Sequence, residues 1–137
     1  MSATDPSPRL RFVLDENLSP RLAQALALLD ESAEVQHLTE VVEIGTDDTV
    51  FLPILGKDGR FLVTRDTRQR TRPQELEAWK KHAVGSFVLG GKNLESWELV
   101  TQVVVAWPRM KEAAVKTRRP FAYRVRPAAG KLEPIPL

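Results

Sequence analysis

Cysteine is absent from the 137-residue sequence, and histidine occurs only twice. Without cysteine the chain has no disulfide framework and no thiolate metal site, and the reducing cytoplasm is the compartment that this composition favours. A metal ion would have to be bound mainly by carboxylates, which suit Mg²⁺ or Mn²⁺ better than zinc. Long hydrophobic runs are also missing, since no stretch of about eighteen apolar residues occurs, and the sequence predicts no membrane span.

The length suits a single domain, which we place at residues 9–127. Residues 1–8 are small, polar and proline-containing, lack the basic and apolar layout of a secretory signal, and are expected to form a flexible tail. Residues 128–137 contain two prolines and are predicted to be a C-terminal tail. Neither an internal repeat nor a linker between domains is evident.

Charge is distributed unevenly along the chain. Residues 22–56 contain seven acidic residues and no lysine or arginine, whereas residues 57–137 contain seventeen basic and eight acidic residues. Such an asymmetry could set a cation-binding region beside a surface that binds a polyanion. Two solvated faces of different composition explain it equally well, so charge alone does not choose between these interpretations.

Short apolar runs alternate with stretches of helical periodicity. Strands are predicted at Leu10–Leu14, Glu34–Leu38, Arg60–Thr64, Ser86–Leu89 and Phe121–Val125. Helices are predicted at Pro20–Asp30, from Asp48 onward, at Thr71–Lys81 and from Asn93 onward. This alternation predicts an α/β fold with three layers, α/β/α, around a mainly parallel sheet of four to five strands.

Details of two helices can also be predicted. Pro53 should lie in the first turn of its helix, where its missing N–H does no harm, and Pro108 should kink or divide the last helix. Trp97 and Trp107 recur on the apolar side of that last helix and are expected in the core.

Three acidic residues fall where a parallel sheet would place them at one edge. Asp15 directly follows the first strand, Asp66 the third, and Asp48 opens the helix between the second and third strands. Ligands of open α/β sheets bind beyond the carboxyl ends of the strands. Converging carboxylates repel one another and are stabilised by cations such as Mg²⁺ or Mn²⁺, which can activate water for attack on phosphorus. These acids therefore form a candidate catalytic metal site, although each alone could cap a helix or form an ion pair.

Arginines gather after the third acid and again near the end of the chain. Guanidinium groups bind phosphate bidentately, so a basic surface beside a carboxylate site suits a protein that holds a nucleic-acid backbone. The residues predicted to bind RNA are Arg65, Arg68, Arg70, Arg72, Arg118 and Arg119. A solvated face with pairs to nearby glutamates is the alternative for the first four.

Several motifs resemble those of the PIN-like families. The motifs are Val13–Leu18 followed by Ser19 and Pro20, Gly45–Asp48 followed by Phe51, and Leu62–Asp66. The tract 68–73 and the segment 119–125 are similar to a subgroup, the PIN-like toxins of the VapC kind found in bacterial toxin–antitoxin operons. The resemblance covers about residues 10–126.

This resemblance implies a ribonuclease that uses Mg²⁺ or Mn²⁺ and is restrained by an antitoxin encoded beside it. By motif, the metal-binding and catalytic roles pass to Asp15, Asp48 and Asp66, with Glu16 as a candidate helper. The resemblance also implies that the chain forms a homodimer. The sequence departs from the fuller PIN pattern after the fourth strand, where Lys92 stands and no clear fourth acid follows.

The leading interpretation is therefore a metal-dependent endoribonuclease, the toxin of a toxin–antitoxin pair. One alternative is a PIN-like module that binds nucleic acid or a partner and has a weak or inactive site, which the missing fourth acid favours. Another is a receiver-like phosphoacceptor domain, with the acid pair Asp15 and Glu16, the phosphorylated residue Asp66 and the later Lys92.

Overall fold

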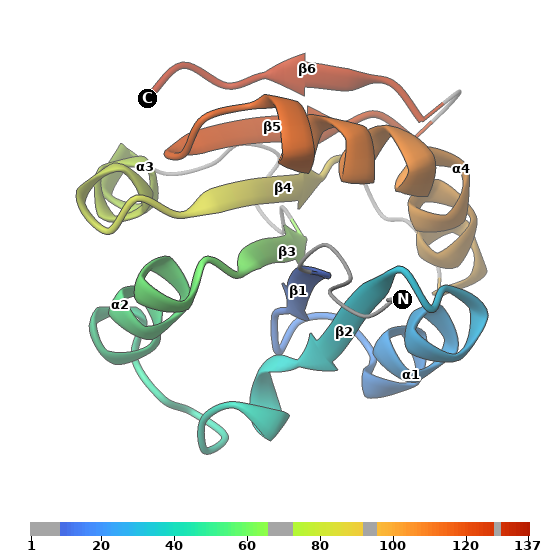
Figure 1. Cartoon of the computed structure of the whole chain (residues 1–137), viewed down its shortest axis with the longest axis horizontal. Coiled ribbons are helices and arrows are strands. Elements are labelled where there is room, and N and C mark those ends of the chain that lie inside the picture. The colour runs from blue at the N-terminus through green and yellow to red at the C-terminus, as the bar shows by residue number, and fades with distance from the viewer. Residues whose placement is uncertain (1–8, 66–72, 92–95, 128–129) are drawn as a thin grey trace, which may run out of the picture.

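A computed structural model describes residues 9–65, 73–91, 96–127 and 130–137. One six-stranded sheet runs through the molecule in the order β2-β1-β3-β4-β5-β6 (Figure 1). Its strands are β1 (Leu10–Leu14), β2 (Ala33–His37), β3 (Phe61–Arg65), β4 (Gly85–Leu89), β5 (Phe121–Val125) and β6 (Leu132–Pro134). The first five are parallel to one another, and β6 pairs antiparallel with β5.

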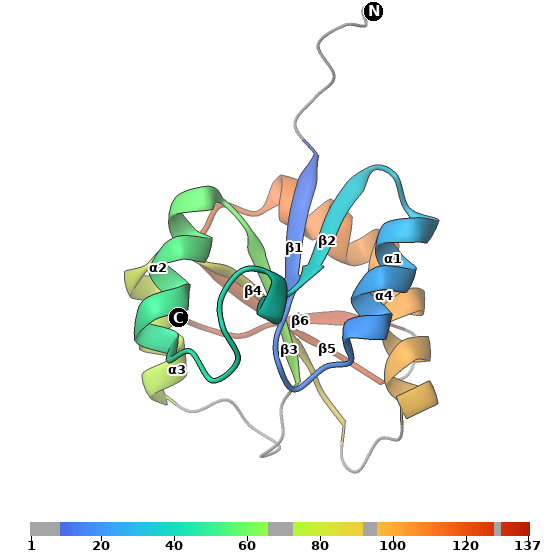
Figure 2. The same ribbon diagram turned by 90° about the horizontal axis from the view of Figure 1, so that it is seen from below.

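Helices cover both faces of the sheet. They are α1 (Pro20–Leu29), α2 (Asp48–Asp58), α3 (Pro73–Lys81) and α4 (Ser96–Lys116), and a short 3₁₀ helix, η1 (Leu38–Glu40), follows β2. In both views α1 and α4 lie on one side and α2 and α3 on the other (Figures 1 and 2). The predicted three-layer α/β/α fold is thus confirmed.

The two sides of the sheet have different cores. Between the sheet and the α1/α4 layer lies an aromatic cluster, in which the ring of Phe12 packs against those of Phe61, Phe87 and Trp107. Between the sheet and the α2/α3 layer the core is mostly aliphatic, with Trp79 of α3 as its large aromatic member. Successive strand residues alternate between these cores, as the pleat requires.

The connection through α4 differs in hand from the other three. Helices α2 and α3 connect strands that progress toward β5 along the α2/α3 face, whereas α4 connects β4 to β5 along the α1 face. Because the direction is the same and the face is opposite, the β4-α4-β5 crossover has the opposite hand, which is rare among parallel connections. Among the described residues, the helix that leads into β5 therefore lies on the α1 face and not on the α2/α3 face.

The sixth strand was not predicted. Leu132–Pro134 was expected to belong to a C-terminal tail, but it pairs with β5 at Leu132↔Val125 and Glu133↔Arg124. Ile135 continues the attachment, since its N–H donates to the Ala122 carbonyl at 2.8 Å. Much of the segment expected to be a tail therefore belongs to the sheet.

Two predictions about the helices were wrong, and a third was wrong in part. Pro53 lies well beyond the first turn of α2, and Pro108 does not divide α4, which continues to Lys116, so that of the two alternatives only a kink is left. Trp97, expected in the core, is 80% exposed, whereas Trp107 is buried. The described residues include no helix with the length and apolar character needed to cross a membrane.

Candidate functional site

The order of the strands reverses between β1 and β3. From β1 the chain moves to β2 on one side, and it then crosses to β3 and continues to β4 and β5 on the other. At such a switch point the two flanking connections diverge and leave a crevice at the carboxyl ends of the strands. The residues that follow β1 and β3 therefore face the position at which ligands bind in open α/β sheets.

Asp15 lies at this switch point, directly after β1. Its backbone N–H donates to the Val63 carbonyl of β3 at 2.9 Å. One carboxylate oxygen accepts the N–H of Glu16 at 2.7 Å, and the other accepts the hydroxyl of Thr64 at 2.8 Å. The carboxylate of Asp15 is thereby fixed in position against the end of β3.

Asn17 connects the same two strands a second time. Its amide donates to the Arg65 carbonyl at 3.0 Å and to the Thr64 hydroxyl at 3.3 Å, and its side-chain oxygen accepts the Arg65 N–H at 3.3 Å. These bonds continue the pairing of β1 with β3 beyond the last residue of β1. The loop that carries Asp15 is consequently bonded to the end of β3 through both Asp15 and Asn17.

Asp48 reaches the site from the first turn of α2, as predicted. The residue as a whole is exposed, but partial loss of hydration at its carboxyl raises the pKa of Asp48, and the negative charges of Asp15 and Asp47 raise that pKa further. Asp47 is the residue that precedes the helix and makes no side-chain capping hydrogen bond. Two of the three predicted acids, Asp15 and Asp48, are therefore close enough to repel each other.

Glu16 and His37 link the loop after β1 to neighbouring segments, Glu16 to the segment before α2 and His37 to the end of β2. A Glu16 carboxylate oxygen accepts the Gly45 N–H at 2.9 Å, which ties the loop after β1 to the segment before α2 (Figure 2). His37 is buried, and its Nε2 bonds to the Leu18 carbonyl at 2.8 Å. Since a carbonyl only accepts, Nε2 carries the proton, and Nδ1 accepts the Thr39 N–H at 3.3 Å.

The remaining predicted site residues are placed as follows. Asp66, Arg68, Arg70 and Arg72 lie outside the described residues, as does Lys92. Arg65 ends β3 at the crevice.

Arg118 and Arg119 precede β5 and lie at the opposite edge of the sheet, about 15 Å from the crevice along a five-residue strand. There Arg119 donates to the Gly56 carbonyl at 3.3 Å, in the last turns of α2. The structure does not bring this pair of arginines to the acidic residues.

Carboxylates, a hydroxyl and solvent are suitable ligands for a hard divalent cation. Within the described ranges, no group of three or more histidine, aspartate or glutamate side chains is placed to hold a metal ion. Magnesium and manganese keep several waters, however, and commonly take only one or two carboxylates from a protein. The pair Asp15 and Asp48 fits that requirement, because a cation between them would offset the repulsion that raises the pKa of Asp48.

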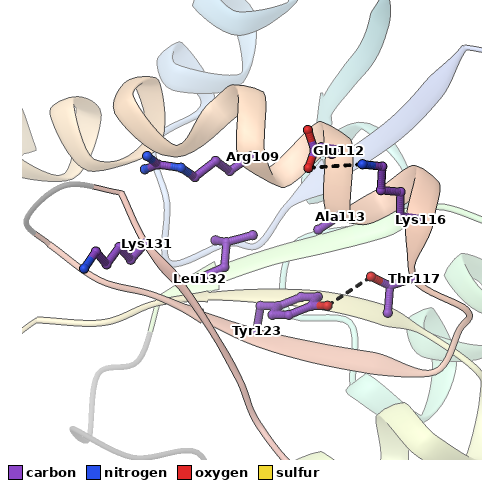
Figure 3. A pocket seen from close by; sticks show the side chains of 8 residues that line it. All are labelled: Arg109, Glu112, Ala113, Lys116, Thr117, Tyr123, Lys131 and Leu132. Carbon is purple, nitrogen blue, oxygen red and sulfur yellow. Dashed lines mark hydrogen bonds and ion pairs between the residues drawn. The ribbon is translucent and has the colours of Figure 1, made fainter.

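A second polar depression lies far from this crevice, between α4, β5 and β6 (Figure 3). It has a volume of about 570 Å³, and Arg109, Lys116 and Lys131 surround it. Glu112 pairs with Lys116 at 3.4 Å, and the hydroxyls of Thr117 and Tyr123 lie 3.0 Å apart at one end. This basic groove faces the α1/α4 side and is separate from the acidic crevice.

Sequence reasoning missed Thr64 and Asn17 as parts of the site. Both lie within the motifs that resemble those of the PIN-like families, but neither was assigned a role in the site. Their spacing carries a signal in hindsight, since Thr64 stands two residues before Asp66 and Asn17 two residues after Asp15. Polar residues at these positions can bond across a parallel strand pair.

The comparison with protein families gives one match. The family described as "PIN like domain" matches residues 10–91, which is more than half of the chain and extends from the first residue of β1 to just beyond β4. Neither the curated proteins nor the solved structures contain a match. The matched segment includes every residue of the acidic crevice.

Proposed function

The chain belongs to the PIN-like domain family, and we propose that it is a metal-dependent endoribonuclease that hydrolyses RNA phosphodiester bonds. The family has a nuclease-type fold. The observation that carries the proposal is the acidic pair, Asp15 and Asp48, at the switch point of the sheet. Asp66 follows the last residue of β3 in sequence and would complete the set.

The proposed ligands of Mg²⁺ or Mn²⁺ are Asp15, Asp48 and Asp66. When bound, the cation supplies Lewis acidity that polarises the phosphoryl group and stabilises the leaving oxygen. Thr64 holds one Asp15 oxygen, and the backbone of Glu16 holds the other, so that the carboxylate does not have to reorganise when a ligand arrives. Glu16 acts as a helper by fixing the Gly45 segment that leads into α2.

The arginines that follow Thr64 in sequence would bind the RNA backbone at the same crevice. These are Arg65, Arg68, Arg70 and Arg72. Contacts of Arg118 and Arg119 with RNA require a substrate long enough to span both edges of the sheet.

The proposal extends to a toxin of a toxin–antitoxin pair that acts in the cytoplasm, with an antitoxin protein as partner and a homodimer as assembly. Its support is the resemblance of segments 68–73 and 119–125 to the VapC-type subgroup.

Calorimetric titration of Mn²⁺ into the full chain, with cleavage of single-stranded RNA measured in parallel, tests the proposal. We expect Asp15→Asn and Asp48→Asn to weaken Mn²⁺ binding at least about tenfold and to slow cleavage on the order of a hundredfold or more, because each removes a charged ligand. Circular dichroism should show both variants folded. Asp47→Asn is the matched control, since it removes an adjacent acid that makes no side-chain capping bond.

Two outcomes would count against the proposal. Cleavage at the wild-type rate by both Asp15→Asn and Asp48→Asn would show that the acidic pair is not the active site. A folded wild-type protein that neither binds Mn²⁺ at millimolar concentration nor cleaves RNA would instead favour a module that binds nucleic acid or a partner.

A further inference from the structure

A single row of residues crosses the sheet beside the acidic crevice. Thr64 of β3 lies opposite Val88 of β4, and Val88 lies opposite Arg124 of β5. Thr64 also bonds to Asp15, so the row begins at the acidic pair. With neighbouring strands about 4.8 Å apart, the backbone of Arg124 lies about 10 Å from that of Thr64.

All members of this row point to the same face. Val88 belongs to the core under α2 and α3, and Phe87 and Leu89 on either side of it belong to the core under α1 and α4. On β5, Ala122 faces α2 and α3, so Arg124, two residues later, shares that face. Asp48 approaches from α2 on this side, and because α4 crosses on the other side, none of the helices in the described part of the chain crosses from β4 to β5 over Arg124 there.

Gly90 shows the direction in which the Arg124 side chain runs. A Cβ atom added to Gly90 would lie 3.2 Å from Cγ and 3.4 Å from Cδ of Arg124, and 3.3 Å from the Val125 carbonyl oxygen. The backbone of Gly90 is not among those with positive φ, so its conformation does not require glycine. The stem of Arg124 passes over Gly90, and an added methyl group would require it to shift by a few tenths of an ångström.

The stem of Arg124 therefore extends past the end of β4 to the carboxyl edge of the sheet. Gly90 directly follows β4, whose last residue lies opposite Arg65 at the end of β3. The stem thus directs the guanidinium toward the edge that carries Asp15, on the face of the sheet that α2 covers. A guanidinium is permanently charged and presents a planar set of donors that matches a phosphate group.

We propose that Arg124, accommodated by Gly90, forms a phosphate subsite that binds a backbone phosphate of RNA next to the acidic pair. The inference rests on the proposed function, which it extends by assigning the residue that holds the substrate beside the reacting bond. Two carboxylates repel the phosphates of RNA, and a fixed cation on the same row offsets that repulsion. Arg124 is then a binding residue rather than a metal ligand.

Steady-state cleavage of single-stranded RNA with Mn²⁺ tests the subsite. Arg124→Met should raise KM about ten- to a hundredfold and lower the slope of log KM against log salt concentration by about one, because one phosphate contact is lost. Arg124→Lys should recover part of this loss. The affinity for Mn²⁺, measured by calorimetry, should not change in either variant.

Gly90→Ala provides a second, independent variant. The added methyl group should displace the Arg124 stem and raise KM in the same direction, while the double variant Gly90→Ala/Arg124→Met should be no worse than Arg124→Met alone. Lys116→Met is the control, because Lys116 is exposed, is also a cation and lines the basic groove of Figure 3. Its KM should match that of the wild type.

The outcomes separate this inference from the proposed function. If the wild type cleaves RNA and Arg124→Met has an unchanged KM, or if Lys116→Met is the more damaged variant, the subsite is wrong and the ribonuclease proposal stands. If the wild type cleaves no RNA, both are wrong. Additive effects of Gly90→Ala and Arg124→Met would show that Gly90 does not act through Arg124, and would also overturn the subsite as described.

Discussion

The two ends of the parallel sheet use their polar residues differently. At the amino end, where the strands begin, arginines bond to backbone carbonyls of the chain: Arg9 to that of Ala33 and Arg119 to that of Gly56. At the carboxyl end, side chains bond to one another around a carboxylate pair whose charges raise the pKa of Asp48.

This difference indicates how the molecule divides stability from function. At the amino end backbone packs against backbone, and the arginines add hydrogen bonds to backbone carbonyl groups. The carboxyl end keeps like charges together, which weakens the folded state but prepares a site for cations. Changes at the amino end should therefore alter stability, and changes at the carboxyl end should mainly alter activity.

Gly56→Ala should have the largest effect of the changes considered. A Cβ at Gly56 would overlap the backbone carbonyl oxygen of His82, where α2 meets the turn after α3. We expect the free energy of unfolding, measured by urea denaturation, to fall by about 3 kcal/mol or more, since neither backbone can yield easily.

Gly45→Ala is the control for Gly56→Ala. Nothing lies within 4 Å of a Cβ at Gly45, and only its φ of +82° opposes a side chain. Gly45→Ala should lower the free energy of unfolding by about 1–2 kcal/mol. Equal losses in the two variants would contradict the tight packing assigned to the amino end.

Asn17→Ala should reduce activity more than stability. The change removes the bonds that hold the loop of Asp15 to Thr64 and Arg65. Groups that orient metal ligands typically contribute ten- to a hundredfold, so we expect kcat to fall by about that factor in the RNA cleavage assay.

A matched change outside the loop of Asp15 is Gln36→Ala in β2, which removes the acceptor of Arg60, the residue before β3. It should lower the free energy of unfolding by about 1 kcal/mol and leave kcat unchanged. A comparable fall of kcat in this variant would show that kcat does not depend specifically on the contacts of the Asp15 loop.

Asp30 should make stability depend on pH in acid. Its carboxylate accepts hydrogen bonds from Lys111 at 2.7 Å and from the Trp107 indole at 2.8 Å, and these contacts, Lys111 first, hold the pKa of Asp30 well below its usual range. Because the folded-state pKa is lowered, the contribution is present above the unfolded-state pKa of about 3.9 and is lost as pH falls toward the folded value.

Denaturation of the wild type and Asp30→Asn at pH 7 and at pH 3 measures this effect. The difference in unfolding free energy should be about 1–2 kcal/mol at pH 7 and smaller at pH 3. Glu34→Gln is the control, because its pair with Arg11 is more exposed and should contribute close to nothing. A wild-type advantage that grows in acid would contradict the sign.

Ala83→Gly should have the smallest effect, and it should stabilise. Ala83 has a φ of 54° and ends α3, with its N–H bonded to the Lys80 carbonyl and that of Val84 to the Trp79 carbonyl. Glycine adopts this left-handed conformation without strain, so thermal denaturation should show a gain of about 0.5–1 kcal/mol. Ala78→Gly, a change inside α3, should lower the stability by a similar amount. A loss of stability in both variants would contradict the strain assigned to Ala83.

The strand and helix pattern could be predicted because the parallel strands are short apolar or alternating runs and α1 begins with a strong signal. Ser19 caps that helix by accepting the Arg21 N–H at 3.1 Å, and Pro20 follows at its first position. The strand β6 gave no such signal, because three residues ending in proline do not reveal an alternating pattern. It forms because β5 presents an open edge.

The error at Trp97 has a single cause on α4. The buried positions include Leu99, Gln102, Val103 and Ala106, and Gln102 is only 1% exposed. Its amide donates to the Gly90 and Val125 carbonyls at 2.7 and 2.8 Å. Because a glutamine occupies this core position, the apolar residues alone do not mark the buried side of α4.

The candidate site was predicted in part. Asp15 and Asp48 could be assigned to one edge because the carboxyl ends of parallel strands converge there. Arg124 could not, because its relation to Thr64 depends on the register of three strands and its direction depends on Gly90. Such register information appears only when the strands are paired.

The short β6 also has a consequence for how molecules of this protein meet one another. An uncovered β5 would present a row of unpaired N–H and C=O groups to which a strand of a second molecule could add. The three residues of β6 cover that row, and their last residue, Pro134, has no N–H to offer. The sheet is thereby ended on this side by a strand too short to template aggregation.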